Sequence, residues 1–325
     1  MTPACAALVL HPDCGRHDTG WSHPEHQGRL PAIVEAIYRD TPALLPHLLQ
    51  HEATPAQLYN VLRVHTAEHV NRVRELSERA RETGRPLVVS GDTAISGASW
   101  DAALAAAGCA LDAVRLVVQR QTSAAFALCR PPGHHAPSNA IMGFCLFNNI
   151  AIAARSLQED HGIRQLLIVD WDVHHGNGTQ DIFYDDGDVY YLSLHQSPWY
   201  PGTGAEAERG QAGGEGRTRN VPIPADTPGT AYLAAFTTAL DAALAEFSPE
   251  FVLVSAGFDC LRGDPLGQLT LEPRDLHAMT CRLMQIAGGR VALVLEGGYA
   301  PRRVGDGVVD VFRALCGLDA KAHSI

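Results

Sequence analysis

Short apolar runs alternate with amphipathic segments along most of this chain. The apolar runs have the length and composition of buried strands and span residues 124–128, 166–169, 189–194, 251–255 and 291–295. Around them, apolar residues recur at the period of a helix that buries one face, in segments 104–118, 233–247 and 304–315. Strands that are apolar on both faces and alternate with helices are typical of a parallel sheet covered on both sides. The sequence therefore predicts an α/β fold, with a central parallel sheet flanked by helices.

The chain carries no repeat and no low-complexity linker. The Gly-rich stretch 201–216 predicts a loop, but it is too short to separate two domains. A length of 325 residues is compatible with one α/β domain. We therefore expect a single domain over residues 1–325, with its core over about 20–317.

Chemically active side chains follow the predicted strands. The sequence RPPGHH (130–135) follows the first strand, DWDVHH (170–175) follows the second, and EGGY (296–299) follows the last. His195 ends the third strand and Asp259 follows the fourth. In open α/β sheets, sites form at the carboxyl ends of the strands. We expect these side chains to meet at that one edge.

Two carboxylates and one imidazole in this set could bind a metal ion. Asp172 and His174 are two residues apart, so on an extended segment they face the same way. Asp259, from another strand end, could complete a three-ligand set with an open position. Such a set suits Zn²⁺ or Fe²⁺, and an open position is what a catalytic metal keeps for water and substrate.

The remaining polar residues suit proton transfer near such a metal. His134 and His135 are adjacent and could serve as general base and general acid, with Asp170 and Asn177 as orienting partners. Tyr299 follows two glycines, and its phenol could donate a hydrogen bond to a developing oxyanion. Together these residues predict metal-assisted hydrolysis of a carbonyl group.

Composition excludes several other kinds of function. The chain has 36 acidic and 25 basic residues and a formal net charge of −11, which disfavours nucleic acid as a partner. Lys321, the only lysine, lies in a polar tail, so neither a P-loop nor Schiff-base catalysis is available. The 8 cysteines form no C-x-x-C pair and indicate reduced thiols in a cytoplasmic protein. The apolar run 4–10 is too short to span a bilayer, so we expect no membrane association and no export signal.

Several long motifs resemble the zinc-dependent histone deacetylase family, in order and over most of the chain, from about residue 23 to 315. The stretch HPEHQGRL (23–30) is similar to the class II and bacterial branch of that family. The motifs that carry the resemblance are RPPGHH (130–135), GFCLFNN (143–149), DWDVHHGNGTQ (170–180), SAGFD (255–259) and EGGY (296–299).

The resemblance implies the arginase/deacetylase fold and one catalytic Zn²⁺ ion, held by Asp172, His174 and Asp259. It also implies a structural K⁺ ion near Asp170, Asp172, His174, Ser193 and Leu194.

The same resemblance assigns roles to the other polar residues. His134 and His135 would manage protons, with Asp170 behind His134, and Tyr299 would polarise the acetamide carbonyl. Class I members carry an aspartate where Asn177 stands. Asparagine can still orient His135 but cannot stabilise its cation by charge, and class II members are similar in this respect.

A substrate tunnel is the last feature that the resemblance implies. Gly143, Phe144 and Tyr200 would line a narrow tunnel for an aliphatic chain, although a phenylalanine is more usual than Tyr200. Asp92 would sit at the rim and bind the substrate backbone or an amine. Leu266 stands where an acidic side chain could select a distal amine, which leucine cannot do.

These inferences predict a zinc-dependent amidohydrolase that removes acetyl or other acyl groups from N-acetyl-lysine side chains of proteins, or from similar small amides. The alternative is an acetylpolyamine amidohydrolase with the same metal set. A ureohydrolase of the arginase type is disfavoured, because the aspartates that a second metal would need are absent. A catalytically inactive acyl binder is disfavoured by Tyr299 and the two histidines. The expected partners are an acetylated protein, a peptide or a small N-acetyl amine, and the sequence leaves the oligomeric state open.

Overall fold

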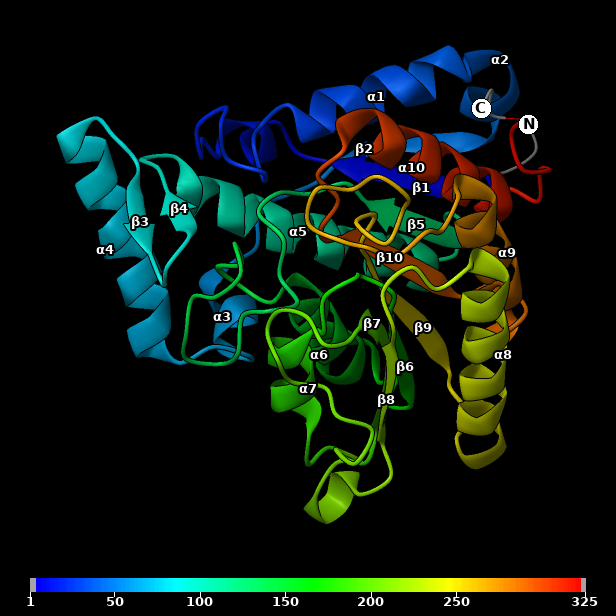
Figure 1. Ribbon diagram of the computed structural model, residues 1–325. Helices are drawn as coiled ribbons and strands as arrows, with labels where there is room; N and C mark the ends of the chain where they lie inside the picture. The colour runs from blue at the N-terminus through cyan, green and yellow to red at the C-terminus, as the bar shows by residue number, and fades with distance from the viewer. Residues whose placement is uncertain (1–3, 323–325) are drawn as a thin grey trace.

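The centre of the protein is a sheet of eight strands in which every pairing is parallel. The computed structural model describes residues 4–322. The order of the strands across the sheet is β2-β1-β5-β10-β9-β6-β7-β8 (Figure 1). Their bounds are β1 (Ala6–Leu10), β2 (Leu48–Glu52), β5 (Ala124–Ala127), β6 (Leu166–Asp170), β7 (Val189–Gln196), β8 (Thr218–Ile223), β9 (Phe251–Ala256) and β10 (Val291–Leu295).

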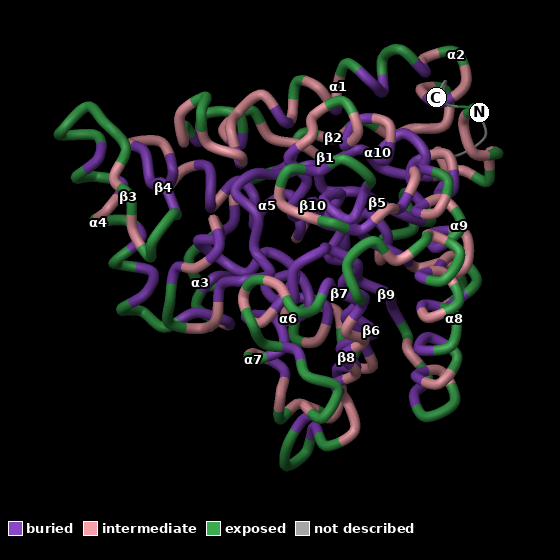
Figure 2. Tube along the Cα trace, viewed as in Figure 1, coloured by how far each residue is buried: buried purple, intermediate pink, exposed green. Residues whose placement is uncertain are grey.

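Helices cover both faces of this sheet. Alternate residues of each strand point to opposite faces, so each face carries its own hydrophobic cluster. In β1, Ala6 and Leu8 belong to one hydrophobic cluster, whereas Ala7 and Val9 belong to the other. The first cluster is closed by α1 (Arg29–Arg39), α8 (Gly229–Glu246), α9 (Pro273–Leu283) and α10 (Pro301–Leu315). The second is closed by α3 (Leu58–Leu62), α4 (Ala67–Thr83), α5 (Ser99–Val118), α6 (Asn149–His161) and α7 (Asn177–Phe183). Figure 2 shows the buried sheet and the exposed outer sides of these helices. A further short helix, α2 (Thr41–Leu44), follows α1.

The predicted elements are confirmed. Each of the five apolar runs is a strand of the sheet, and the three amphipathic segments coincide with α5, α8 and α10. Three strands of the main sheet were not predicted, and neither were the two strands of a separate hairpin. The edge strands β2 and β8 are only partly buried and carry polar residues, so they lack a continuous apolar run. β1 lies inside the sheet between β2 and β5, so the core begins before residue 20, earlier than expected. In the described part of the chain, no helix is long and apolar enough to cross a membrane.

A small hairpin stands apart from the main sheet, beside α4 (Figure 1). Its antiparallel strands are β3 (Leu87–Val89) and β4 (Thr93–Ile95), and Asp92 lies in the turn between them. The predicted loop over residues 201–216 contains only one short 3-10 turn, Ala212–Gly214.

Four adjacent strands, β5, β10, β9 and β6, form the middle of the sheet. The loops that leave their carboxyl ends carry the polar motifs 130–135, 296–299, 255–259 and 170–175. Because parallel strands all end at the same edge, these four loops converge, as the sequence predicted.

Candidate active site

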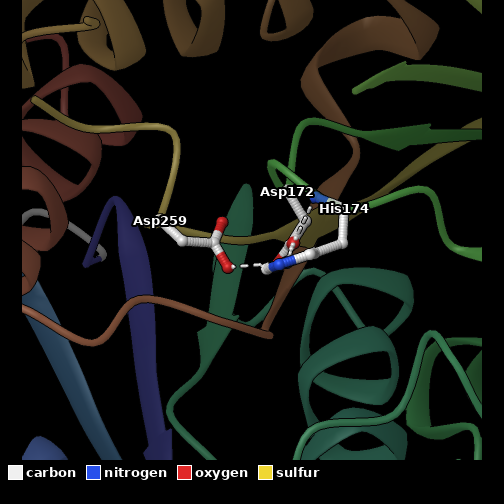
Figure 3. Close-up of side chains that lie close together, drawn as sticks. All are labelled: Asp172, His174 and Asp259. Atoms are coloured by element: carbon white, nitrogen blue, oxygen red, sulfur yellow. Dashed lines mark hydrogen bonds and ion pairs between the residues drawn. The ribbon is translucent and has the colours of Figure 1, made fainter. Parts of the chain in front are cut away.

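Three side chains that could hold a metal ion meet beyond the ends of β6 and β9. One potential ligand atom each from Asp172, His174 and Asp259 lies within 4.8 Å of the others, and all three residues are buried. Nδ1 of His174 lies 3.0 Å from Oδ1 of Asp172 and 3.3 Å from Oδ2 of Asp259. Figure 3 shows the imidazole between the two carboxylates. Among the described residues, this is the one group of three or more such side chains that could hold a metal.

The environment of these three residues fits a cation. Oδ2 of Asp259 faces His174 but accepts no well-aligned hydrogen bond, so a buried carboxylate oxygen is left unsatisfied. The backbone also leaves room beside the carboxylates, because a Cβ on Gly297 would stand 2.0 Å from Oδ2 of Asp259 and 2.7 Å from Oδ2 of Asp172. Two carboxylates and one imidazole nitrogen are a ligand set that Zn²⁺ accepts, with further positions open.

The net charge of Asp172, His174 and Asp259 also favours the binding of a cation. Burial opposes the charge on His174, but Asp172 and Asp259 outweigh it and raise the pKa of His174 to about 10. Burial, together with the charge of Asp172, raises the pKa of Asp259 to about 7. Two buried carboxylates that share one imidazolium proton form a centre of negative potential, which a divalent cation would neutralise.

The two adjacent histidines are each held by a different partner. Nδ1 of His134 lies 3.0 Å from Oδ2 of Asp170, and Nδ1 of His135 lies 2.8 Å from Oδ1 of Asn177. The amide oxygen of Asn177 can only accept, so His135 donates from Nδ1. This leaves Nε2 of each ring as its second proton site, and Nε2 of His134 lies 3.8 Å from Oδ1 of Asp172. The structure thus brings together the pairs that the sequence predicted.

The two rings differ in their affinity for protons. Burial opposes the charge on His134, but Asp170 and Asp172 raise its pKa to about 10. Burial lowers the pKa of His135 well below its usual value, and the charges of His134 and His174 lower it further. Adjacent imidazoles of opposite protonation state suit one proton donor and one proton acceptor.

Tyr299 lies in the loop that follows β10, on the same edge of the sheet as the two histidines. It follows Gly297 and Gly298, and the φ of +119° at Gly298 is one that other residues rarely adopt. Arg29 donates from Nε to the carbonyl oxygen of Gly298 at 2.6 Å, and its guanidinium lies 5.3 Å from the centre of the Tyr299 ring. Burial raises the pKa of Tyr299 well above its usual value, so the phenol keeps its proton for donation.

A cavity of about 540 Å³ leads from the surface to these groups. The predicted substrate residues Asp92, Gly143, Phe144, Tyr200 and Leu266 all line it. It is also lined by His23, Pro24, Val88, His135, His174, Trp199 and Tyr299.

The inner walls of the cavity are aromatic. Phe144 packs edge-on against Tyr299, with ring centres 5.9 Å apart, and Tyr200 packs against His135 at 5.3 Å. Gly143 lets the wall approach His135, because a Cβ there would stand 2.4 Å from Cδ2 of that ring. Because Gly143 has no side chain, the main chain itself forms the wall of the cavity beside His135.

Four residues of the rim had no assigned role in the sequence prediction. His23 donates from Nε2 to the carbonyl oxygen of Asp92 at 3.0 Å and packs against Phe144, with ring centres 4.7 Å apart. Trp199 donates from Nε1 to the carbonyl oxygen of Leu266 at 2.8 Å. Val88 is 67% exposed, and Pro24 completes the rim. Only the HPE sequence, which contains His23 and Pro24, offered a signal, since Val88 and Trp199 come from other parts of the chain.

One residue expected at the shared edge lies outside the cavity. His195, expected at the shared edge, is buried and contacts Ser193 through Nδ1 and the carbonyl oxygen of Gly204 through Nε2, so it does not line the cavity. The strand register does place Ser193 opposite Asp170. Binding of K⁺ stays a prediction, for the set Asp170, Asp172, His174, Ser193 and Leu194.

Comparisons with known proteins agree with this geometry. A family model described as the histone deacetylase domain matches residues 23–315. Histone deacetylase 10, chloroplastic, from Oryza sativa subsp. japonica is 37% identical over 315 residues, which cover 91% of this chain and 70% of that protein. A probable deacetylase from Archaeoglobus fulgidus is 37% identical over 297 residues, which cover 90% and 81%. Because the relatives include a chloroplastic and an archaeal protein, the cytoplasmic location stays a prediction.

A solved structure shares the fold. The crystal structure of the HDA15 HD domain superposes with a TM-score of 0.90 at 36% sequence identity, and the match covers 98% of this chain and 91% of that one. The predicted arginase/deacetylase fold, a single domain around a parallel sheet, is thereby confirmed. The chain belongs to the histone deacetylase family, and it is a hydrolytic deacetylase.

Proposed function

We propose that this deacetylase removes acetyl groups from N-acetyl-lysine side chains of proteins or peptides, or from small N-acetyl amides of the same shape, with the help of Zn²⁺. The observation that carries the proposal is the cavity, which the aromatic residues Phe144, Tyr200 and Tyr299 line together with the candidate metal ligand His174. An unbranched aliphatic stem fits such a cavity, and its amide would reach the polar groups at the end.

The residues at the end of the cavity divide the chemistry between them. Asp172, His174 and Asp259 would hold the Zn²⁺ ion, which when bound supplies Lewis-acid activation of water and of the amide carbonyl. Tyr299 would donate its hydroxyl proton in a hydrogen bond to the carbonyl oxygen as negative charge develops there.

The paired histidines would handle the protons. Because Asp170 and Asn177 hold the Nδ1 atoms, the Nε2 atoms of His134 and His135 remain for exchange with the attacking water and the leaving amine. His135 lines the cavity, so it would take the proton of the attacking water and then pass it to the leaving amine.

The apolar residues of the cavity wall favour a substrate whose aliphatic stem carries no charge. Trp199, Val88 and Leu266 contribute apolar surface to the lining of the cavity. A polyamine carries protonated nitrogens, and their desolvation beside such groups is unfavourable unless a carboxylate pairs with them. Leu266 offers no such partner. N-acetyl-lysine has its charge masked by the acetyl group, so its stem enters without this penalty.

The alternative activity, acetylpolyamine hydrolysis, has one observation in its favour, the exposed carboxylate of Asp92 at the rim. A substrate panel separates the two. The purified enzyme is assayed with acetyl-lysine peptides, acetylputrescine, acetylspermidine and longer acyl-lysines. We expect the best acetyl-lysine peptide to exceed acetylspermidine at least about tenfold in kcat/KM, equivalent to about 1.4 kcal/mol of transition-state binding. Equal efficiencies would establish the polyamine activity instead.

A further inference from the structure

A single buried carboxylate joins the loop after β9 to the loop after β10. Oδ2 of Asp264 accepts hydrogen bonds from the backbone N–H of Tyr299 at 2.6 Å and of Ala300 at 3.2 Å. Its other oxygen, Oδ1, accepts the N–H of Leu266 at 2.9 Å. Asp264 is only 7% exposed, so these three donors compensate a charge that has left water.

The segment that ends in Tyr299 needs such an anchor. Gly297 and Gly298 have no side chains, so this part of the loop is held through its backbone. The N–H of Gly297 donates to Oδ2 of Asp172 at 2.9 Å, and Arg29 holds the carbonyl oxygen of Gly298. The next two N–H groups, those of Tyr299 and Ala300, have Asp264 as their acceptor. Beyond Ala300 the chain enters α10.

The same carboxylate also holds the cavity wall. The N–H of Leu266 is bound by Asp264, and its carbonyl oxygen is bound by Trp199. Leu266, Trp199 and Tyr299 all line the cavity. Asp264 thus connects the backbone of the phenol-bearing residue at the inner end with the backbone of a wall residue near the entrance.

We propose that Asp264, through its hydrogen bonds to the backbone N–H groups of Tyr299 and Ala300, is a positioning residue that holds the Tyr299 hydroxyl where the amide carbonyl is attacked. This inference rests on the proposed function. Asp264 itself touches no substrate. Its effect is to keep the phenol in place, and a displacement of about 1 Å at such a site can lower the rate about a hundredfold.

A double-mutant cycle tests the proposal. The isosteric Asp264→Asn variant replaces one acceptor oxygen by an NH₂ group, and it is compared with Tyr299→Phe and with the double variant on an acetyl-lysine peptide. We expect Asp264→Asn to lower kcat about tenfold or more with KM changed less than about twofold, because only transition-state binding is lost. In the Tyr299→Phe background the same substitution should lower kcat less than about twofold, because the hydroxyl it positions is already gone.

The control is Asp112→Asn. Asp112 is also 7% exposed and also accepts a backbone N–H, that of Thr54 at 3.1 Å, but it lies on α5 away from the cavity. Its substitution should leave kcat unchanged. If Asp264→Asn lowers kcat by the same factor in both backgrounds, or if it removes bound metal, Asp264 acts on the fold or on the metal site and the proposal is overturned.

Hydrogen–deuterium exchange supplies a readout that does not depend on activity. The amide protons of Tyr299 and Ala300 should exchange at least about tenfold faster in Asp264→Asn than in the wild type, and at the wild-type rate in Asp112→Asn. Unchanged exchange in Asp264→Asn would overturn the proposal. A wild type that hydrolyses no N-acetyl amide would overturn the proposed function instead, while the exchange rates would still decide whether Asp264 orders Tyr299.

Discussion

His135 and Asn177 form a hydrogen bond of 2.8 Å between Nδ1 and Oδ1, and this bond fixes the orientation of the ring that lines the cavity. Asn177 is the first residue of α7, so the helix start supplies the anchor. Because Asn177 presents an amide oxygen, it sets the tautomer of His135 without adding a charge.

Replacing this anchor should impair catalysis more than folding. In Asn177→Ala, His135 loses the partner of Nδ1, and we expect kcat to fall about 10- to 100-fold, as when other supporting hydrogen bonds of an active site are removed. Steady-state kinetics with an acetyl-lysine peptide measure the effect. The control is Asn71→Ala on the exposed side of α4, which should retain full activity. Wild-type kcat in Asn177→Ala would show that Asn177 does not orient His135.

Removing any one of the candidate ligands should remove the metal. Asp172→Ala, His174→Ala and Asp259→Ala each leave two ligands, and three protein ligands provide no redundancy. We expect bound zinc, measured by elemental analysis of the purified protein, to fall well below one ion per chain, and activity to disappear. Hydroxamates, which chelate a metal at an open position, should inhibit the wild type. Full zinc occupancy in all three variants would refute the assignment.

The phenol of Tyr299 should contribute to turnover rather than to affinity. Tyr299→Phe removes one hydroxyl and keeps the ring that packs against Phe144. Loss of one oxyanion donor typically lowers kcat about 100- to 1,000-fold. Binding of an acetyl-lysine peptide, measured by titration calorimetry, should survive. Tyr38→Phe, at a ring that is 60% exposed, is the control. Unchanged turnover in Tyr299→Phe on every substrate would exclude this role.

The rim carboxylate should discriminate between long and short substrates. Asp92 lies in the β3–β4 turn, where His23 holds its carbonyl oxygen and leaves its side chain in solvent. Asp92→Asn should lower kcat/KM for acetyl-lysine peptides more than for small coumarin amides of acetyl-lysine, because only a peptide backbone extends over the rim. The two ratios of kcat/KM, variant to wild type, test this. Equal ratios would show that Asp92 does not contact the peptide.

Buried histidines away from the cavity predict an acid-sensitive fold. Burial lowers the pKa of His17 to about 4, and burial together with His69 lowers that of His65 to about 3. The unfolded chain regains the usual value of about 6.5, so it binds protons that the native state excludes. The stability is therefore fully present above about pH 6.5 and is lost as the pH falls towards these values, by up to about 1.4 kcal/mol per pH unit for each histidine.

Urea unfolding followed by circular dichroism between about pH 7.5 and pH 4 measures this slope. In His65→Gln the free energy of unfolding should fall less steeply with decreasing pH than in the wild type. Above about pH 6.5 the two proteins should show the same pH dependence, which serves as the internal control. Identical slopes below that pH would mean that His65 does not contribute.

Burial explains most of the strands that were predicted or missed, although β1 is almost entirely buried and was not predicted. Strands such as β9 and β10 are buried along their whole length, so an apolar run marks them. The edge strand β2 alternates between partial burial and exposure and carries Gln50 and His51, so its composition does not differ from that of a loop. The order of the strands also could not be predicted, because it depends on pairings between segments far apart in the chain.

The candidate ligand and catalytic residues were predictable where they follow a strand directly. Asp172 and His174 face the same way because of their spacing, and Asp259 and Tyr299 reach them because parallel strands end together. His195 obeys the same rule but contacts Gly204 instead, because the loop that follows β7 folds back over it. Position at a strand end is therefore not sufficient to place a residue in the site.

By itself, the sequence determined the fold class, the candidate ligands and the residues that surround them, since local patterning and the geometry of strand ends carry that information. Only the tertiary structure decided which residues meet along the cavity, where Val88 comes from β3 and Trp199 and Leu266 come from two separate loops. It also decided that Asp264 holds Tyr299, across 35 residues of sequence. The physical reason is that hydrogen bonds and contacts between distant loops depend on where the folded backbone places them, and no local periodicity records that placement.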